Sequence, residues 1–155
     1  MPHFFNDILS LNCSGIFRST DSYKVKRRKI QKSVLLPTQL CNTHSHTDLE
    51  SEWCTVPSPD YGCSGLPCTD MSRAGYGMKK HGPTNSVYMT HGKFVERKKV
   101  PIFTVECTPE SRLIRSEFSE FNFSCQQNYS HNFQFLFFFP RFYYPNLRRC
   151  PELPP

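Results

Sequence analysis

The sequence predicts a mostly irregular chain with one small α+β element: a short strand over residues 102–107, a helix over residues 109–121, and an aromatic strand over residues 133–139. Composition is the first observation behind this fold class. The 155 residues include a single alanine, Ala74, against 14 phenylalanines and 13 prolines, and a chain that lacks the best helix former does not favour long helices. The second observation is where regular apolar patterns occur in the chain. They appear mainly after residue 100, beyond a stretch rich in proline and glycine, so the predicted elements lie in the C-terminal part of the chain.

The predicted strand and helix follow one another directly. Residues 100–107 read VPIFTVEC, which is apolar and β-branched enough for a strand with Phe103 and Val105 on one face. Thr108 then suits the N-cap and Pro109 the first position of a helix. The apolar side chains that share one face of this helix are Leu113, Ile114, Phe118 and Phe121.

The aromatic run FQFLFFF, residues 133–139, alternates with period two, as extended structure does. It fits a core strand, and its lack of charge and proline also fits an aggregation-prone cross-β segment. A third interpretation is a stacking platform for single-stranded nucleic acid, with phosphate contacts from Arg141, Arg148 and Arg149.

The rest of the chain divides by composition. Residues 1–54 form an N-terminal segment that we expect to be poorly ordered, with one or two helical turns near its apolar start. Residues 55–86 indicate a Pro/Gly-rich loop or linker, because turn-forming residues dominate there. Residues 87–145 are expected to form a weak α+β unit, and residues 146–155 a Pro-rich tail.

Cysteines and histidines cluster between residues 41 and 68. The spacings Cys41-x2-His44 and Cys63-x4-Cys68 resemble the local pairs, about two to four residues apart, that hold zinc in a tetrahedral site. They predict a Cys3His zinc site made of Cys41, His44, Cys63 and Cys68, with His46 or Cys54 as alternative ligands. The competing interpretation is a loop of thiols and imidazoles without a metal, because a chain with eight cysteines and six histidines contains such spacings by chance.

A basic stretch over residues 24–32, KVKRRKIQK, carries much of the net charge of +6. Ile30 falls on one helical face with Val34 and Leu35, so the segment fits a basic amphipathic helix. Its cations favour a patch for nucleic acid or for a nuclear-import receptor, with a solvated charged segment as the alternative. These cations are Lys24, Lys26, Arg27, Arg28, Lys29 and Lys32.

The eight cysteines also allow a secreted, disulfide-bonded glycoprotein with glycans on Asn12, Asn122 or Asn128. Residues 1–17 lack the basic start and unbroken apolar stretch of a signal peptide, which favours a nuclear or cytoplasmic location instead. No stretch reaches the roughly 20 apolar residues of a transmembrane helix. Because the motifs of common hydrolases, metalloproteases and nucleotide-binding enzymes are also missing from the sequence, we do not expect an enzyme.

These local signals do not agree on one global fold, as they do in sequences selected for folding. The leading prediction is therefore an orphan-type chain without an assignable biochemical activity or cofactor, such as a fortuitous open reading frame produces. The alternatives are a small zinc-stabilised basic module that binds nucleic acid, and the secreted disulfide-bonded glycoprotein.

Overall fold

The computed structural model describes residues 3–5, 7–43, 53–67, 69–70, 75–107, 123–130 and 133–140 of the chain. In chain order its elements are η1 (Ile8–Leu11), α1 (Tyr23–Lys32), β1 (Thr38–Leu40), β2 (Trp53–Thr55), β3 (Tyr61–Gly65), η2 (Lys79–His81), α2 (Asn85–Arg97), β4 (Ile102–Cys107), β5 (Phe123–Ser130) and β6 (Phe133–Pro140). Within these ranges, no helix has the length and apolar character needed to cross a membrane.

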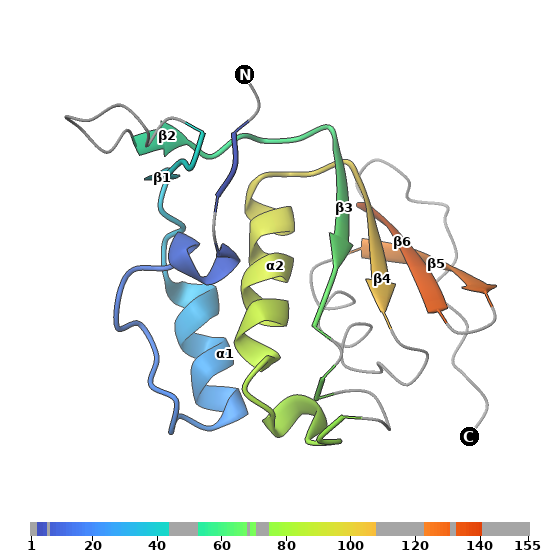
Figure 1. Ribbon diagram of the computed structural model, residues 1–155, viewed down its shortest axis with the longest axis horizontal. Coiled ribbons are helices and arrows are strands. Elements are labelled where there is room, and N and C mark those ends of the chain that lie inside the picture. The colour runs from blue at the N-terminus through green and yellow to red at the C-terminus, as the bar shows by residue number, and fades with distance from the viewer. Residues whose placement is uncertain are drawn as a thin grey trace.

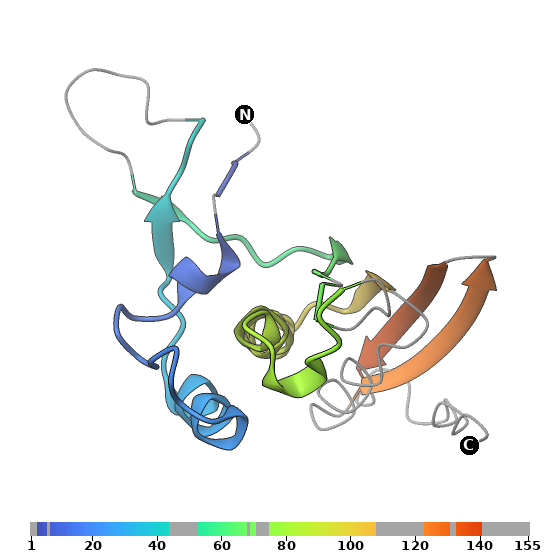
Figure 2. The same ribbon diagram turned by 60° about the horizontal axis from the view of Figure 1, so that its bottom comes forward.

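Helix α2 lies at the centre, with α1 on one side and strands β3 and β4 on the other (Figures 1 and 2). Side chains of α2 contact both α1 and the sheet. Nζ of Lys93 donates to the backbone oxygen of Ile30 in α1 over 2.5 Å, and the His91 ring meets the edge of Phe103 in β4. The buried apolar side chains on and around this helix include Ile30, Tyr88, Met89, Val95, Val100, Phe103 and Val105.

The N-terminus of α2 is held by a buried carboxylate from an earlier segment. Oδ2 of Asp70 accepts the backbone N–H of Thr84 over 2.8 Å and its hydroxyl over 2.5 Å, so a negative charge lies at the positive end of the helix. Asp70 is fully buried, and a Cβ at Gly82 would lie 2.0 Å from its carboxyl carbon. The close approach of the carboxylate therefore requires glycine at position 82.

The C-terminus of α2 ends in a Schellman motif. The backbone N–H of Val100 donates to the oxygen of Val95 over 3.1 Å, and that of Lys99 to the oxygen of Glu96 over 3.2 Å, which is the pair of bonds that defines the motif. Val95 and Val100 are both buried, as the hydrophobic pair of such a motif usually is. Lys99 occupies the left-handed position, with φ at 52°, where glycine is the usual residue.

The larger sheet has four strands in the order β3, β4, β6, β5. Strands β3 and β4 are parallel, so their connection must cross over, and α2 forms that crossover. Strand β6 pairs antiparallel with both β4 and β5, with Phe103 opposite Phe138. Phe103 and Val105, which the sequence predicts on one face of this strand, are both fully buried.

A second, two-stranded sheet joins β1 to β2 in antiparallel pairing, with Gln39 opposite Cys54. The N-terminal segment runs beside it. Nε2 of Gln39 donates to the backbone oxygen of Ser10 over 2.6 Å, and the backbone N–H of Leu36 donates to the oxygen of Leu11 over 2.8 Å. These bonds hold the start of the chain against β1.

The small α+β element predicted from the sequence is present in outline, since the described residues form two α-helices and small sheets. Strand β4 (Ile102–Cys107) has the predicted bounds, β6 (Phe133–Pro140) covers the predicted aromatic strand, and the basic stretch forms helix α1. The helix predicted over residues 109–121 lies outside the described residues. The range 55–86, predicted as a loop or linker, contains β3, η2 and the start of α2, because β3 gains backbone hydrogen bonds from β4, which is distant in sequence.

Candidate metal centre

Two features of the fold bring one histidine and two cysteines together at the β1–β2 sheet. The backbone N–H of Asn42 donates to the oxygen of Phe4 over 2.8 Å, which sets His3 beside Cys41. The pairing of β1 with β2 places Cys54 opposite Gln39, near Cys41 at the end of β1. Residues that are far apart in the sequence thus meet at one edge of the small sheet.

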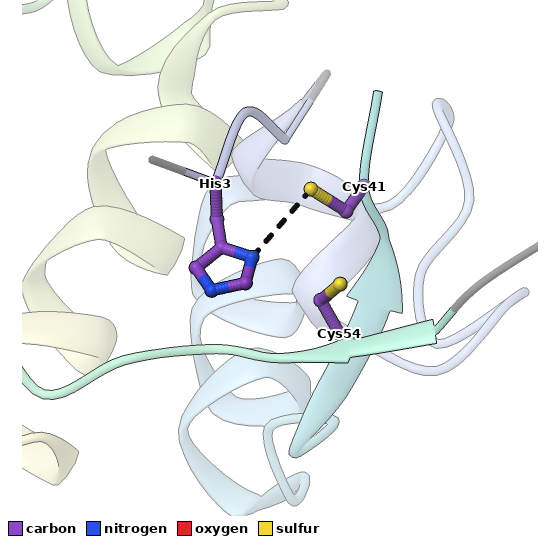
Figure 3. A group of neighbouring side chains, drawn as sticks. All are labelled: His3, Cys41 and Cys54. Carbon is purple, nitrogen blue, oxygen red and sulfur yellow. Dashed lines mark hydrogen bonds between the residues drawn. The ribbon is translucent and has the colours of Figure 1, made fainter. Parts of the chain in front are cut away.

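The donor atoms of His3, Cys41 and Cys54 all lie within 4.8 Å of one another. Nδ1 of His3 is 3.7 Å from Sγ of Cys41. Figure 3 shows the sulfur of Cys41 above that of Cys54, with the His3 ring beside them and one ring nitrogen directed at the Cys41 sulfur. In a tetrahedral zinc site with Zn–S near 2.3 Å and Zn–N near 2.0 Å, neighbouring donors are roughly 3.5–3.8 Å apart, so the His3–Cys41 separation is already close to one edge of the tetrahedron.

The electrostatics of Cys41 favour the thiolate, which is the form that binds metals. Burial alone raises the pKa of this thiol, but hydrogen bonds with His3 and with the backbone at Phe4 and Thr43 outweigh burial and lower the pKa from 9.0 to about 5. Cys41 is fully buried, Cys54 is half-buried and His3 is exposed. The group therefore has one buried donor, Cys41, and is accessible to an ion from solvent on the side of His3.

The donor set decides which metal fits. Two thiolates and an imidazole are soft and borderline ligands that suit zinc, whereas magnesium and calcium require oxygen. The ring of His3 stacks on Phe5 with an angle of 15° between planes and 6.2 Å between centroids, and its Nδ1 faces Sγ of Cys41. The group provides three of the four ligands of a tetrahedral site.

The zinc site predicted from the sequence is only partly within the described residues. Cys41 belongs to the group, and so does Cys54, the predicted alternative ligand. Cys63 is exposed on β3 in the other sheet and is not part of the group. His44, His46 and Cys68 lie outside the described residues, so the combination of Cys41, His44, Cys63 and Cys68 stays a prediction.

His3 was missed because its signal is not local. It is 38 residues from Cys41, and spacing rules consider only ligands that are close in sequence. The neighbouring apolar pair does not mark its position either, because Phe4 is 62% exposed and Phe5 is half-buried.

The predicted basic patch is divided by the fold. Arg28, Lys24 and Lys32 are exposed on α1, Arg27 is half-buried, and Lys26 is buried with 7% of its surface exposed. Nζ of Lys29 pairs with Oδ2 of Asp21 over 2.7 Å. The run is therefore not one continuous strip of available positive charge.

Two observations bear on the secreted alternative. Asn12 is buried, and its Nδ2 donates to Oγ1 of Thr90 over 2.8 Å, so a glycan on this nitrogen would require the side chain to leave the core. Among the described cysteines, Cys13, Cys41, Cys54 and Cys63 are thiols. Asn122 lies outside the described residues, and Asn128 lies on β5.

Comparisons with protein-family models, curated proteins and solved structures gave no match. The donor atoms of His3, Cys41 and Cys54, with their distances and burial, are what mark this group as a candidate metal centre.

Proposed function

We propose that this protein is a small basic module that binds one zinc ion through His3, Cys41 and Cys54. The observation that carries the proposal is the convergence of three metal-binding atoms within 4.8 Å. They come from the N-terminal segment, from the end of β1 and from β2, so a bound ion would link three separate pieces of chain. The role of the metal is structural: it fastens the N-terminal segment to the small sheet.

The need for such a link follows from the size of the elements. Strands β1 and β2 have three residues each, and a two-stranded sheet of this length is marginal in water. An ion that binds only the folded chain stabilises it by mass action, by about 2.7 kcal/mol when free zinc exceeds its Kd 100-fold. That amount is a large part of the stability of a small domain.

The test is the native mass of the untagged chain, purified with zinc present. We expect one zinc per chain, its loss on chelation, and a lower midpoint of thermal unfolding for the chelated protein. Cys41→Ser and Cys54→Ser should each abolish stoichiometric binding. The matched controls are Cys13→Ser and Cys63→Ser, because both thiols are exposed and lie outside the group, and they should retain the ion.

The same experiment separates the competing proposals. An orphan-type chain without activity predicts no stoichiometric metal, and chelation would leave the unfolding midpoint unchanged. A secreted disulfide-bonded protein predicts a mass that rises on reduction by about two hydrogens per bridge. If Cys13→Ser or Cys63→Ser removes zinc as effectively as Cys41→Ser, the His3–Cys41–Cys54 group is not the site.

A further inference from the structure

A pocket of about 420 Å³ lies between the start of α1 and the short helix η2. Both ribbon views place these two elements at the same end of the molecule (Figures 1 and 2). The volume falls within the roughly 300–1,000 Å³ that is usual for small-molecule sites. Side chains that line it include Tyr23, Lys24, Arg27 and Arg28 from α1, and Lys80 and His81 from η2.

The lining is strongly one-sided in charge. Lys24, Arg27, Arg28 and Lys80 are cations, and none of the described residues that line the pocket is acidic. Like charges held around one space repel each other, and an anion in that space relieves the repulsion. The chemistry of the pocket therefore favours a negatively charged ligand.

This grouping is not simply a consequence of the basic run. Residues 24, 27 and 28 share one face of α1 because they are three and four positions apart. The fold directs Lys26 into the interior and pairs Lys29 with Asp21, so neither cation lines the pocket. Lys80 is added from η2, more than 50 residues further along the chain.

Arginine side chains favour phosphate over other anions at this position. A guanidinium presents a planar set of N–H donors that binds two phosphate oxygens together. Arg27 is half-buried, and burial lowers the pKa of its guanidinium, so its charge is partly shielded from water and its hydrogen bonds to an anion are stronger. The first turn of α1 carries no acidic residue and adds its positive helix end to the same side of the pocket.

We propose that the pocket between α1 and η2 binds the phosphate groups of a phosphorylated small molecule, with Arg27, Arg28 and Lys80 as the phosphate ligands. The pocket shares no residue with the metal group, so the inference does not depend on the zinc proposal. Phosphate groups of this kind occur in nucleotides and as inorganic pyrophosphate, and the two sources are distinguished by separate titrations.

The experiment is isothermal calorimetry of the full chain with ADP, with pyrophosphate and with adenosine. We expect saturable binding of ADP, pyrophosphate or both, an affinity that falls as salt is raised, and no saturable binding of adenosine. Arg28→Glu and Lys80→Glu should each lower the affinity roughly tenfold or more, because each removes a charged hydrogen bond. Lys32→Glu is the matched control: Lys32 is exposed on the same helix and does not line the pocket, and its reversal should change the affinity by less than about twofold.

Chemical shifts of backbone amides during a titration of the unmodified protein provide a second readout that needs no variant. The shifts that respond to pyrophosphate or ADP should centre on residues 22–28 and 79–81. Absence of saturable binding by both phosphate probes would overturn the inference. Equal losses in Lys32→Glu and Arg28→Glu would also overturn it, since they would show general charge attraction without a site.

Discussion

Mild acid should destabilise the fold through one buried imidazole, that of His91. This side chain projects from α2 with 6% of its surface exposed. Its Nε2 lies 2.6 Å from Oγ of Ser64 in β3, and its ring centroid lies 6.0 Å from that of Phe103 in β4. Because the imidazole is buried away from solvent, its pKa is lowered from 6.5 to about 4.

The sign and size of the effect follow from proton linkage. The pKa of His91 is lower in the folded protein than in the unfolded chain. As the pH falls below 6.5, His91 is therefore protonated in the unfolded chain before it is protonated in the folded protein. Stability is therefore lost on acidification between pH 6.5 and about pH 4. The full loss is about 3 kcal/mol, and the part lost between pH 7 and pH 5 is about 2 kcal/mol.

The assay is urea unfolding followed by circular dichroism at pH 7 and pH 5, for the unmodified protein and for His91→Gln. Glutamine keeps a polar group opposite Ser64 but does not titrate. We expect the stability advantage of the unmodified protein over His91→Gln to shrink by about 2 kcal/mol at the lower pH. His81→Gln, at an exposed histidine, should show the full pH dependence of the unmodified protein. Equal losses of stability in the unmodified protein and His91→Gln would refute the argument.

Three further substitutions test the ends and the docking of α2 by urea unfolding. Gly82→Ala should lower the free energy of unfolding by about 3 kcal/mol, because its Cβ would displace the buried carboxylate of Asp70, whose carbon lies 2.0 Å away. The control Gly65→Ala meets only a side-chain oxygen at 3.4 Å and should lower it by less than about 1 kcal/mol; equal losses in the two variants would contradict this account. Lys99→Gly should stabilise the protein by about 1 kcal/mol, since glycine accepts the left-handed backbone without strain; a loss of stability would count against the Schellman motif. A double-mutant cycle of Asn12→Ala and Thr90→Val should give a coupling of about 1 kcal/mol, because their hydrogen bond is buried, and additive effects would show that the bond contributes nothing.

The parts of the fold that could be predicted are those with a local cause. Strand β4 has the predicted bounds because its residues are apolar and β-branched, and Phe103 and Val105, predicted on one face, are both buried. Helix α2 gave no comparable signal. Its sequence includes Thr90, His91 and Gly92 in mid-helix, all poorer helix formers than alanine. Its stability comes from tertiary contacts on opposite sides, which a search for a single apolar stripe does not detect.

The candidate metal site shows the same limit. Local spacing predicts Cys41 as a ligand and Cys54 as an alternative ligand, because the two lie close together in the sequence. Their partner His3 depends on one long-range backbone hydrogen bond between Asn42 and Phe4. No pattern in the sequence specifies that bond, because backbone groups are the same at every residue.

The structure also changes how the basic stretch should be interpreted. A receptor that binds a linear basic motif contacts consecutive cationic side chains. In α1 these side chains are not all available, because Lys26 is buried and Lys29 is paired with Asp21. To present all of these charges at once, the helix would have to unfold and give up the burial of Ile30, which contributes about 1.5–3 kcal/mol. The folded chain instead brings Arg28 of α1 and Lys80 of η2 to the lining of one pocket.

A peptide that spans residues 22–33 distinguishes binding by the linear motif from binding by the folded pocket, because it retains every cation of the motif but lacks Lys80. If polyanions bind this peptide as tightly as they bind the whole chain, the linear motif is the relevant unit, and if they bind it more weakly, the folded pocket is.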